Sequence, residues 1–288
     1  MNTVSSSTPT VIIAAYNEAN IIQNTLRVLT GDNFIANDKS SFQVMVVCNG
    51  CSDNTAELVT QNFPQVHCCS IQPASKALAI QKAESFNPGF PRLYLDADIE
   101  LSKSDALFLF AQASNTSPAT LLIPSSVTNS EQSSNAVKRF YTIWEKTPYT
   151  QILGYGAGAY LLNKAGRERF NIWPELIADD AFVRSQFSSE EIQIATDCKV
   201  SVKAPKDLKS LIKVKARSKH GNLQLRRYLE LNKHHKYDHK KLMSLSSVST
   251  NIVDKIVYVL INVTALAIAK AQHLTGSKKW LRDHSNRS

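Results

Sequence analysis

Short apolar runs alternate with helical patterns along the first part of the chain. Apolar runs at 9–15 and 42–47 predict buried strands, and two further strands are predicted at 66–71 and 92–95. Three stretches with apolar residues at helical spacing lie between them, at 20–29, 56–59 and 75–86, and Asn20 is positioned to cap the first. Strands that alternate with helices form right-handed βαβ units, so we expect an α/β fold with a mostly parallel, Rossmann-like sheet flanked by helices.

The pattern continues with two further apolar runs, at 120–124 and 159–163, on either side of a predicted helix at 135–145. A glycine-rich loop, GYGAG at 154–158, precedes the second run. No linker interrupts the first 215 residues. We therefore expect one domain over residues 1–215, followed by a basic, helical extension over 216–288.

Polar residues follow three of the predicted strands, at 16–18, 49–53 and 96–98. The carboxyl ends of parallel strands meet at one rim of a sheet, where α/β folds bind ligands. Asp96 and Asp98 are two residues apart, so on a strand both carboxylates would point to the same side. Such a pair suits Mn²⁺ or Mg²⁺ held together with a diphosphate, although a surface turn explains many isolated pairs of this kind.

A second acidic pair, Asp179 and Asp180, lies among apolar residues in ELIADDAFVR. Adjacent carboxylates in an apolar setting raise the pKa of one of them, which suits a general base near neutral pH. The same pair is also typical of the first turn of a helix, where negative charge is stabilising.

The positive charge of the chain is concentrated in one segment. The net charge is +9, yet residues 203–241 carry 13 Lys and Arg against 3 Asp and Glu, so the remainder is close to neutral. This distribution indicates a localised anionic partner, such as phosphates, anionic lipid or nucleic acid, or else a solvated basic face.

An apolar segment, 252–270, follows the basic one. The fourteen residues between Lys255 and Lys270 carry no charge, which is fewer than the roughly 20 needed to cross a bilayer. A buried core helix and a segment at a membrane interface both fit. The basic tail with Trp280 favours the membrane. Five cysteines without an export signal indicate reduced thiols and a cytoplasmic location.

Five segments together resemble the family 2 glycosyltransferases, inverting enzymes of the GT-A fold that occur in bacterial polysaccharide biosynthesis. The segments are TVIIAAYNEANII, VVCNGCSDNT, SKALAIQKA, YLDADIELS and ELIADDAFVR, in family-like order and spacing over residues 9 to about 187. The resemblance implies a nucleotide-sugar donor, a divalent metal ion (Mn²⁺ or Mg²⁺) and displacement with inversion at the anomeric carbon.

The resemblance also implies roles for individual residues. The donor nucleotide would be bound at Ala15, Tyr16, Glu18, Asn49, Asp53, Lys76, Asp96 and Ala97. Asp98 would ligate the metal, and Asp180 would be the catalytic base, with Asp179 where the family usually has Glu. Arg217 and His220 match a segment that closes over the diphosphate in related enzymes; the general basic face is the alternative.

One departure concerns the nucleotide loop. Many members have two adjacent acids after the second strand, where this chain has Cys48 and Asn49. An amide both donates and accepts hydrogen bonds, whereas a carboxylate only accepts, so the donor base is not fixed as uracil.

We therefore expect a cytoplasmic, membrane-associated hexosyltransferase on the inner face of the plasma membrane. Its acceptor would be a free or lipid-linked saccharide in polysaccharide or glycolipid synthesis, its partner surface an anionic membrane, and nucleic acid would not be a partner. A sugar nucleotidyltransferase is one alternative, but no Gly-rich, Arg-containing loop follows the first strand. A non-catalytic scaffold that binds nucleic acid or membrane is another, and it leaves the acids at 96, 98 and 180 unexplained.

Overall fold

The computed structural model describes residues 8–31, 42–114, 118–232 and 250–275. Trp280 of the expected membrane-associated tail lies outside these residues. The chain forms two compact units that interleave along the sequence. Unit 1 comprises Met1–Ser125, Ala157–Glu175 and Glu190–Val200, and unit 2 comprises Ser126–Gly156, Leu176–Ser189 and Ser201–Ser288. The boundary expected at residues 215 and 216 falls inside a single helix, α9 (Leu208–Leu231).

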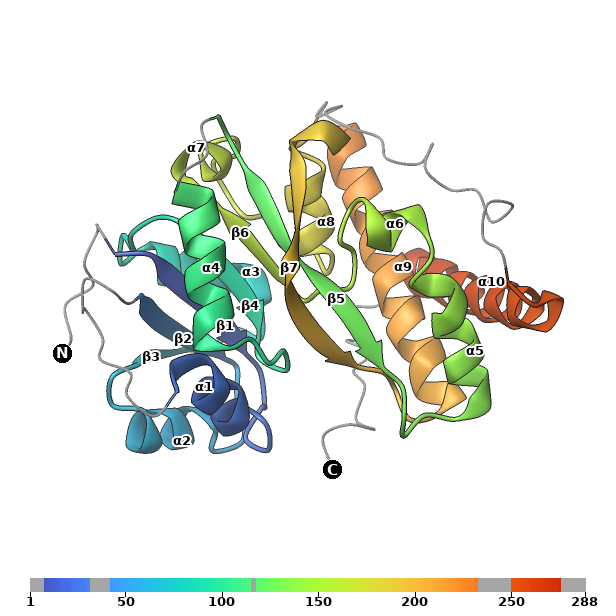
Figure 1. Cartoon of the computed structure of the whole chain (residues 1–288), viewed down its shortest axis with the longest axis horizontal. Helices are drawn as coiled ribbons and strands as arrows, with labels where there is room; N and C mark the ends of the chain where they lie inside the picture. Colours follow the sequence, from blue (N-terminus) through green and yellow to red (C-terminus); the bar gives the residue numbers. More distant parts are fainter. Residues whose placement is uncertain (1–7, 32–41, 115–117, 233–249, 276–288) are drawn as a thin grey trace. The chain divides into compact units, whose positions relative to one another are not determined.

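A seven-stranded sheet has the order β3-β2-β1-β4-β6-β5-β7 (Figure 1). The strands are β1 (Thr10–Ala15), β2 (Gln43–Asn49), β3 (His67–Ile71), β4 (Arg92–Asp96), β5 (Leu121–Asn129), β6 (Ala159–Leu162) and β7 (Ile192–Lys203). The pairings among β1, β2, β3 and β4 are parallel, while β6 is antiparallel to both β4 and β5. The six strands expected from apolar runs are confirmed; β7 was not expected.

The inner strands β1 and β2 are almost fully buried, whereas the edge strand β3 is only partly buried. The inner strands are apolar because helices of unit 1 cover the sheet. These helices are α1 (Ile22–Thr30), α2 (Thr55–Asn62), α3 (Lys76–Glu84), α4 (Lys103–Ser114) and the short α7 (Lys164–Arg167). Helix α3 packs on β1 and β2, and α1 packs against α2 and α4. The expected cap at Asn20 is wrong: α1 starts after Ile21 without a side-chain cap, because a turn closes first with the Ile22 N–H donating to the Glu18 carbonyl.

A buried ionic cluster around Glu84 joins α3, β4 and α7 within unit 1. The Glu84 carboxylate accepts hydrogen bonds from Arg92, Tyr94, Arg167 and Trp173, over 2.6 to 3.1 Å. Its side chain is only 10% exposed, and those of Arg92 and Arg167 are 7% and 14% exposed. The Glu84 carboxylate is therefore the counter-charge of two buried guanidinium groups, those of Arg92 and Arg167.

Unit 2 contains the remaining helices, with the carboxyl ends of β5 and β7. These helices are α5 (Asn135–Trp144), α6 (Pro148–Gln151), α8 (Asp179–Arg184), α9 and α10 (Ile252–Leu274); the one-turn η1 (Ser189–Glu191) spans both units. Helix α10 packs against α5 and α9, with Tyr258 stacked on Phe140 at 4.9 Å between ring centroids. Among the described helices, α10 is the only one that is long and apolar enough to cross a membrane. The buried core helix of a soluble protein can have the same length and composition.

Candidate active site

The three polar clusters expected at one rim lie at the carboxyl ends of β1, β2 and β4. Ala15 pairs with Cys48 of β2, and Ala14 pairs with Asp96 of β4, so the three parallel strands end at the same level. The structure therefore brings together in unit 1 all nine site residues expected there: Ala15, Tyr16, Glu18, Asn49, Asp53, Lys76, Asp96, Ala97 and Asp98.

Hydrogen bonds between side chains and backbone connect the segments that follow β1 and β2. The buried Asn49 amide donates from Nδ2 to the Ala15 carbonyl at 2.8 Å, so that amide nitrogen already has a protein partner. The Glu18 N–H donates to Thr55 Oγ1 at 2.8 Å, which fixes the backbone that carries Tyr16 and Glu18. Tyr16 is half-buried, whereas Glu18 is buried.

Asp53 connects the same two loops. Its carboxylate accepts hydrogen bonds from the N–H groups of Ala19 and Thr55, both at 3.1 Å, and from the Thr55 hydroxyl. Partial burial acts to raise the pKa of Asp53, but these hydrogen bonds outweigh it and lower the pKa below its ordinary value. An ionised Asp53 thus shapes the loop.

Lys76 and Asp96 form an ion pair at the rim. Lys76 is the first residue of α3, behind a cap in which Ser75 Oγ accepts from the Leu78 N–H at 3.3 Å. Its Nζ donates to Asp96 Oδ1 at 2.6 Å, and the two side chains are 27% and 40% exposed. The pair places one cation and one carboxylate side by side at the rim.

The Asp-Ala-Asp segment does not lie on a strand throughout. Strand β4 ends at Asp96, and Ala97 and Asp98 form a turn in which the Ile99 N–H donates to the Asp96 carbonyl at 3.1 Å. The expectation that strand alternation aligns the two carboxylates is therefore wrong, because alternation ends with the strand. Ala97 is buried and its carbonyl accepts from Thr25 Oγ1, whereas Asp98 is exposed.

Gly158, the last residue of the glycine-rich loop 154–158, also belongs to this rim. Its carbonyl accepts from the Asp96 N–H at 2.8 Å, and its φ is +63°. A Cβ atom at this position would lie 2.5 Å from Ile99 Cγ1 and 3.2 Å from Asp96 Oδ2. Glycine is thus required for the close approach of this backbone to Asp96.

The expected base lies in unit 2, at the start of α8. Asp179 is buried at 4% exposure, whereas the Asp180 side chain is 39% exposed. Both acids occupy the first helical turn, so the helix also benefits from their charge. Of the two carboxylates, Asp180 is the one that a bound molecule can reach.

Arg184 holds Asp180 in place and was not among the expected site residues. Its guanidinium donates to Asp180 Oδ2 and to the carbonyls of Leu153 and Gly154, each at 2.8 Å. Arg184 is 2% exposed and lies over the Tyr155 ring at 4.4 Å. Its spacing of four residues from Asp180 on a helix was the available sequence signal.

Arg217 and His220, expected near a diphosphate, both lie on α9. Arg217 is half-buried. His220 is buried, with Nε2 3.0 Å from Gln224 Nε2 and its ring 5.9 Å from that of His273 on α10. Burial is the main reason that the pKa of His220 lies below its ordinary value. The described contacts of His220 are those of helix packing, and a role at the diphosphate stays a prediction.

The carboxylates at the rim fit a metal ion that is shared with a substrate. Within the four described ranges, no group of three or more His, Cys, Asp or Glu side chains forms a ready metal site. Mg²⁺ and Mn²⁺ commonly bind through one or two carboxylates, several waters and the phosphates of the substrate. The exposed Asp98, next to the paired Asp96, provides that donor set.

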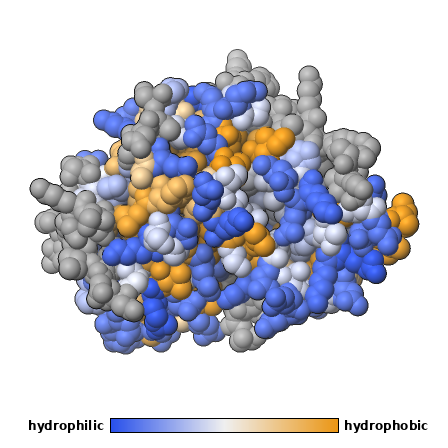
Figure 2. Space-filling model, viewed as in Figure 1, coloured by the Kyte–Doolittle hydropathy of each residue, from blue (hydrophilic) through white to orange (hydrophobic). Residues whose placement is uncertain are grey.

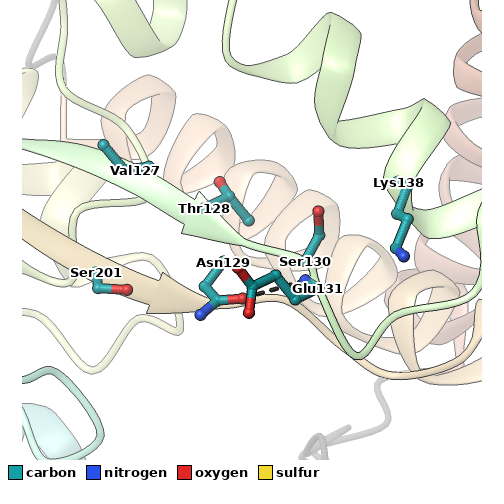
Figure 3. Close-up of a pocket in the computed structure, with 7 residues that line it drawn as sticks. All are labelled: Val127, Thr128, Asn129, Ser130, Glu131, Lys138 and Ser201. Carbon is teal, nitrogen blue, oxygen red and sulfur yellow. Dashed lines mark hydrogen bonds between the residues drawn. The ribbon is translucent and has the colours of Figure 1, made fainter.

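A shallow pocket of about 490 Å³ lies elsewhere, in unit 2 (Figure 3). It is lined by residues 127–131, the first three of which end β5, together with Lys138 and Ser201. Among these residues, the Glu131 N–H donates to Asn129 Oδ1 at 3.1 Å. No expected site residue lines it.

Comparison with solved structures identifies the fold. The mannosyltransferase PcManGT from Pyrobaculum calidifontis, in complex with GDP-Man and Mn²⁺, matches with a TM-score of 0.59 and 16% identity, covering 96% of this chain and 79% of PcManGT. S. aureus TarS 1–349 matches with a TM-score of 0.49 and 14% identity, covering 93% of this chain and 88% of TarS 1–349. Glucosyl-3-phosphoglycerate synthase from Mycobacterium tuberculosis matches with a TM-score of 0.47 and 14% identity, covering 65% of this chain and 69% of the synthase.

No protein-family model and no curated protein sequence matches the chain. At 16% identity, the similarity to PcManGT is evidence for fold only. The chain has the GT-A fold, as its sequence motifs implied.

Proposed function

We propose that this chain is an inverting glycosyltransferase that transfers a hexosyl group from a nucleotide-sugar donor to a saccharide acceptor. The observation that carries the proposal is the rim of unit 1, where β1, β2 and β4 end at the same level. There Asp96 at the end of β4 pairs with Lys76 of α3, and Asp98 follows in the next turn. PcManGT, which has the same fold, was crystallised with GDP-Man and Mn²⁺, and we propose ligands of the same class here.

The donor would bind along this rim. The nucleoside would lie against the loop of Ala15, Tyr16 and Glu18 and against the loop of Asn49 and Asp53, whose mutual hydrogen bonds pre-organise them. The ribose and diphosphate would follow toward Lys76, Asp96 and Ala97.

Asp98 would hold Mn²⁺ or Mg²⁺ together with the diphosphate. Such an ion stabilises the negative charge that develops on the departing diphosphate. Lys76 would add a fixed positive charge at the rim, and Asp96 keeps its ammonium group in place.

Asp180 would act as the general base. The acceptor hydroxyl oxygen forms a bond to the anomeric carbon, the bond from that carbon to the diphosphate oxygen breaks, and the hydroxyl proton passes to the Asp180 carboxylate. Attack opposite the leaving group inverts the configuration. Arg184 orients the carboxylate without touching substrate, and Asp179 contributes local charge from a buried position.

The acceptor we propose is a saccharide carried on a lipid, in polysaccharide or glycolipid synthesis at the cytoplasmic face of the membrane. The basic segment 203–241 and the apolar helix α10 support this class of acceptor. We also propose that Arg217 and His220 of α9 contact the diphosphate of the bound donor.

Product analysis tests the transfer reaction. Full-length protein with Mn²⁺ is incubated with UDP-, GDP- and dTDP-sugars and a lipid-linked saccharide pool, and the released phosphate species are separated. We expect a nucleoside diphosphate from one donor. Release of pyrophosphate from a nucleoside triphosphate and a sugar phosphate would instead identify a nucleotidyltransferase, and no product with any donor would favour a scaffold.

A further inference from the structure

Helix α10 presents an apolar face that no described part of unit 2 covers. Large aliphatic side chains are exposed along its whole length: Ile252, Val253, Ile256, Val259, Leu260, Val263, Leu266, Ile268 and Leu274. Leu260 is 61% and Val263 60% exposed. Figure 2 shows hydrophobic residues at the right edge of the molecule, where Figure 1 draws the end of α10. A contiguous apolar face of this kind marks a surface that binds a partner.

The opposite face of α10 is anchored in unit 2. Tyr258, Ile261, Ala265 and Ala269 are buried there. Near its start, Asp254 forms an ion pair of 2.7 Å with Arg139 of α5. The helix is therefore buried along one side and exposed along the other.

These contacts decide how α10 can meet a membrane. Helix α9, on which α10 packs, carries seven Lys and Arg residues against one Glu. If α10 crossed a bilayer in this packing, the charged α9 would enter hydrocarbon, at several kcal/mol for each charge near the centre. A helix that lies in the plane of the interface keeps those charges in the headgroup region and buries only its apolar face.

The charge also decides between a bilayer and a second copy of the chain. Residues 201–232 carry nine Lys and Arg against two Asp and Glu. A symmetric dimer through α10 would bring two such segments near each other, and their repulsion opposes association. An anionic lipid surface matches the apolar face and the basic segment at once.

We propose that the exposed face of α10 docks the protein on an anionic lipid bilayer, with the helix parallel to the surface and not across it. Docking adds a partner to the proposed transferase and requires no sugar transfer. Failure of docking and failure of the proposed reaction are therefore distinguishable.

Vesicle flotation tests the docking with full-length protein. The vesicles contain phosphatidylcholine alone, or phosphatidylcholine with phosphatidylglycerol. We expect wild type to float with the anionic vesicles, to bind phosphatidylcholine much less, and to be released by high salt. The double variant Leu260→Glu with Val263→Glu should bind at least about tenfold more weakly, since each buried aliphatic side chain accounts for roughly that factor.

The matched control is Val127→Glu with Ile172→Glu, which changes net charge equally at two exposed aliphatic residues outside α10, 52% and 69% exposed. It should bind like wild type, and circular dichroism should show both variants folded. Equal vesicle binding by the α10 variant would overturn the proposal. So would salt-resistant binding, which indicates a spanning helix, or a dimer that the α10 variant converts to monomer without any vesicle binding.

Discussion

The Asp180→Asn variant should transfer sugar about 10²- to 10⁴-fold more slowly than wild type, with unchanged affinity for the donor nucleotide. Asparagine has the shape of aspartate, and its carbonyl oxygen can still accept the hydrogen bond from Arg184. It cannot take the proton of the acceptor hydroxyl. Donor binding should persist because Asp180 is not among the residues proposed to hold the donor. Single-turnover transfer and nucleotide titration measure the two effects separately.

Asp197→Asn is the matched control for this experiment, since Asp197 is an exposed acid on β7 without a proposed role. It should transfer sugar at the wild-type rate. Transfer at the wild-type rate by Asp180→Asn would contradict its role as base. If Asp179→Asn were the inactive variant instead, the buried acid would be the one that takes the proton.

The second large effect is expected on stability, from Glu84→Gln. The neutral side chain leaves Arg92 and Arg167 buried without a counter-charge, so we expect the free energy of unfolding to fall by about 3 kcal/mol or more at pH 7. Chemical denaturation monitored by circular dichroism measures this loss. Glu168→Gln, which removes an exposed partner 3.9 Å from Lys164, should cost less than about 0.5 kcal/mol.

The effect of Glu84 should also depend on pH in a defined direction. Burial acts to raise the pKa of Glu84, but the hydrogen bonds and charge of Arg167, with help from Tyr94 and Arg92, bring it below its ordinary value of 4.5. A lowered carboxyl pKa stabilises the fold above the unfolded pKa, and this contribution is lost as the pH falls through the folded pKa. The difference in free energy of unfolding between wild type and Glu84→Gln should therefore become smaller as the pH is lowered. If the free energies of unfolding of wild type and Glu84→Gln differed little at pH 7, Glu84 would not be the stabilising counter-charge of Arg92 and Arg167.

The sequence predicted those elements of the fold whose burial produces a local pattern of apolar residues. Buried strands such as β1 and β2 are apolar throughout because helices cover the sheet, and this pattern can be read directly. The polar residues after them then had to meet at one rim. β7 was not predicted because the strand predictions were based on continuous apolar runs. IQIATDCKVSVK instead alternates apolar and polar residues, which is the pattern of a half-buried strand.

Other features depend on contacts between distant residues. The turn at Ala97 and Asp98 follows from where β4 ends, and the need for glycine at 158 follows from its approach to Ile99 and Asp96. The packing of His220 against α10 depends on tertiary structure. Single-sequence patterns carry no information on such pairs. The division into two units could not be predicted for the same reason, because each unit is formed by segments that are distant in the sequence.

Calorimetric titration of UDP, GDP and dTDP into full-length protein, with and without Mn²⁺, tests the central claim most directly. Wild type should bind one of the three nucleotides in a Mn²⁺-dependent manner. Asp98→Asn should lose the Mn²⁺ dependence, while the control Asp197→Asn should retain it. If folded wild-type protein bound none of the nucleotides, or if Asp98→Asn bound with unchanged Mn²⁺ dependence, the donor site proposed at the ends of β1, β2 and β4 would be contradicted.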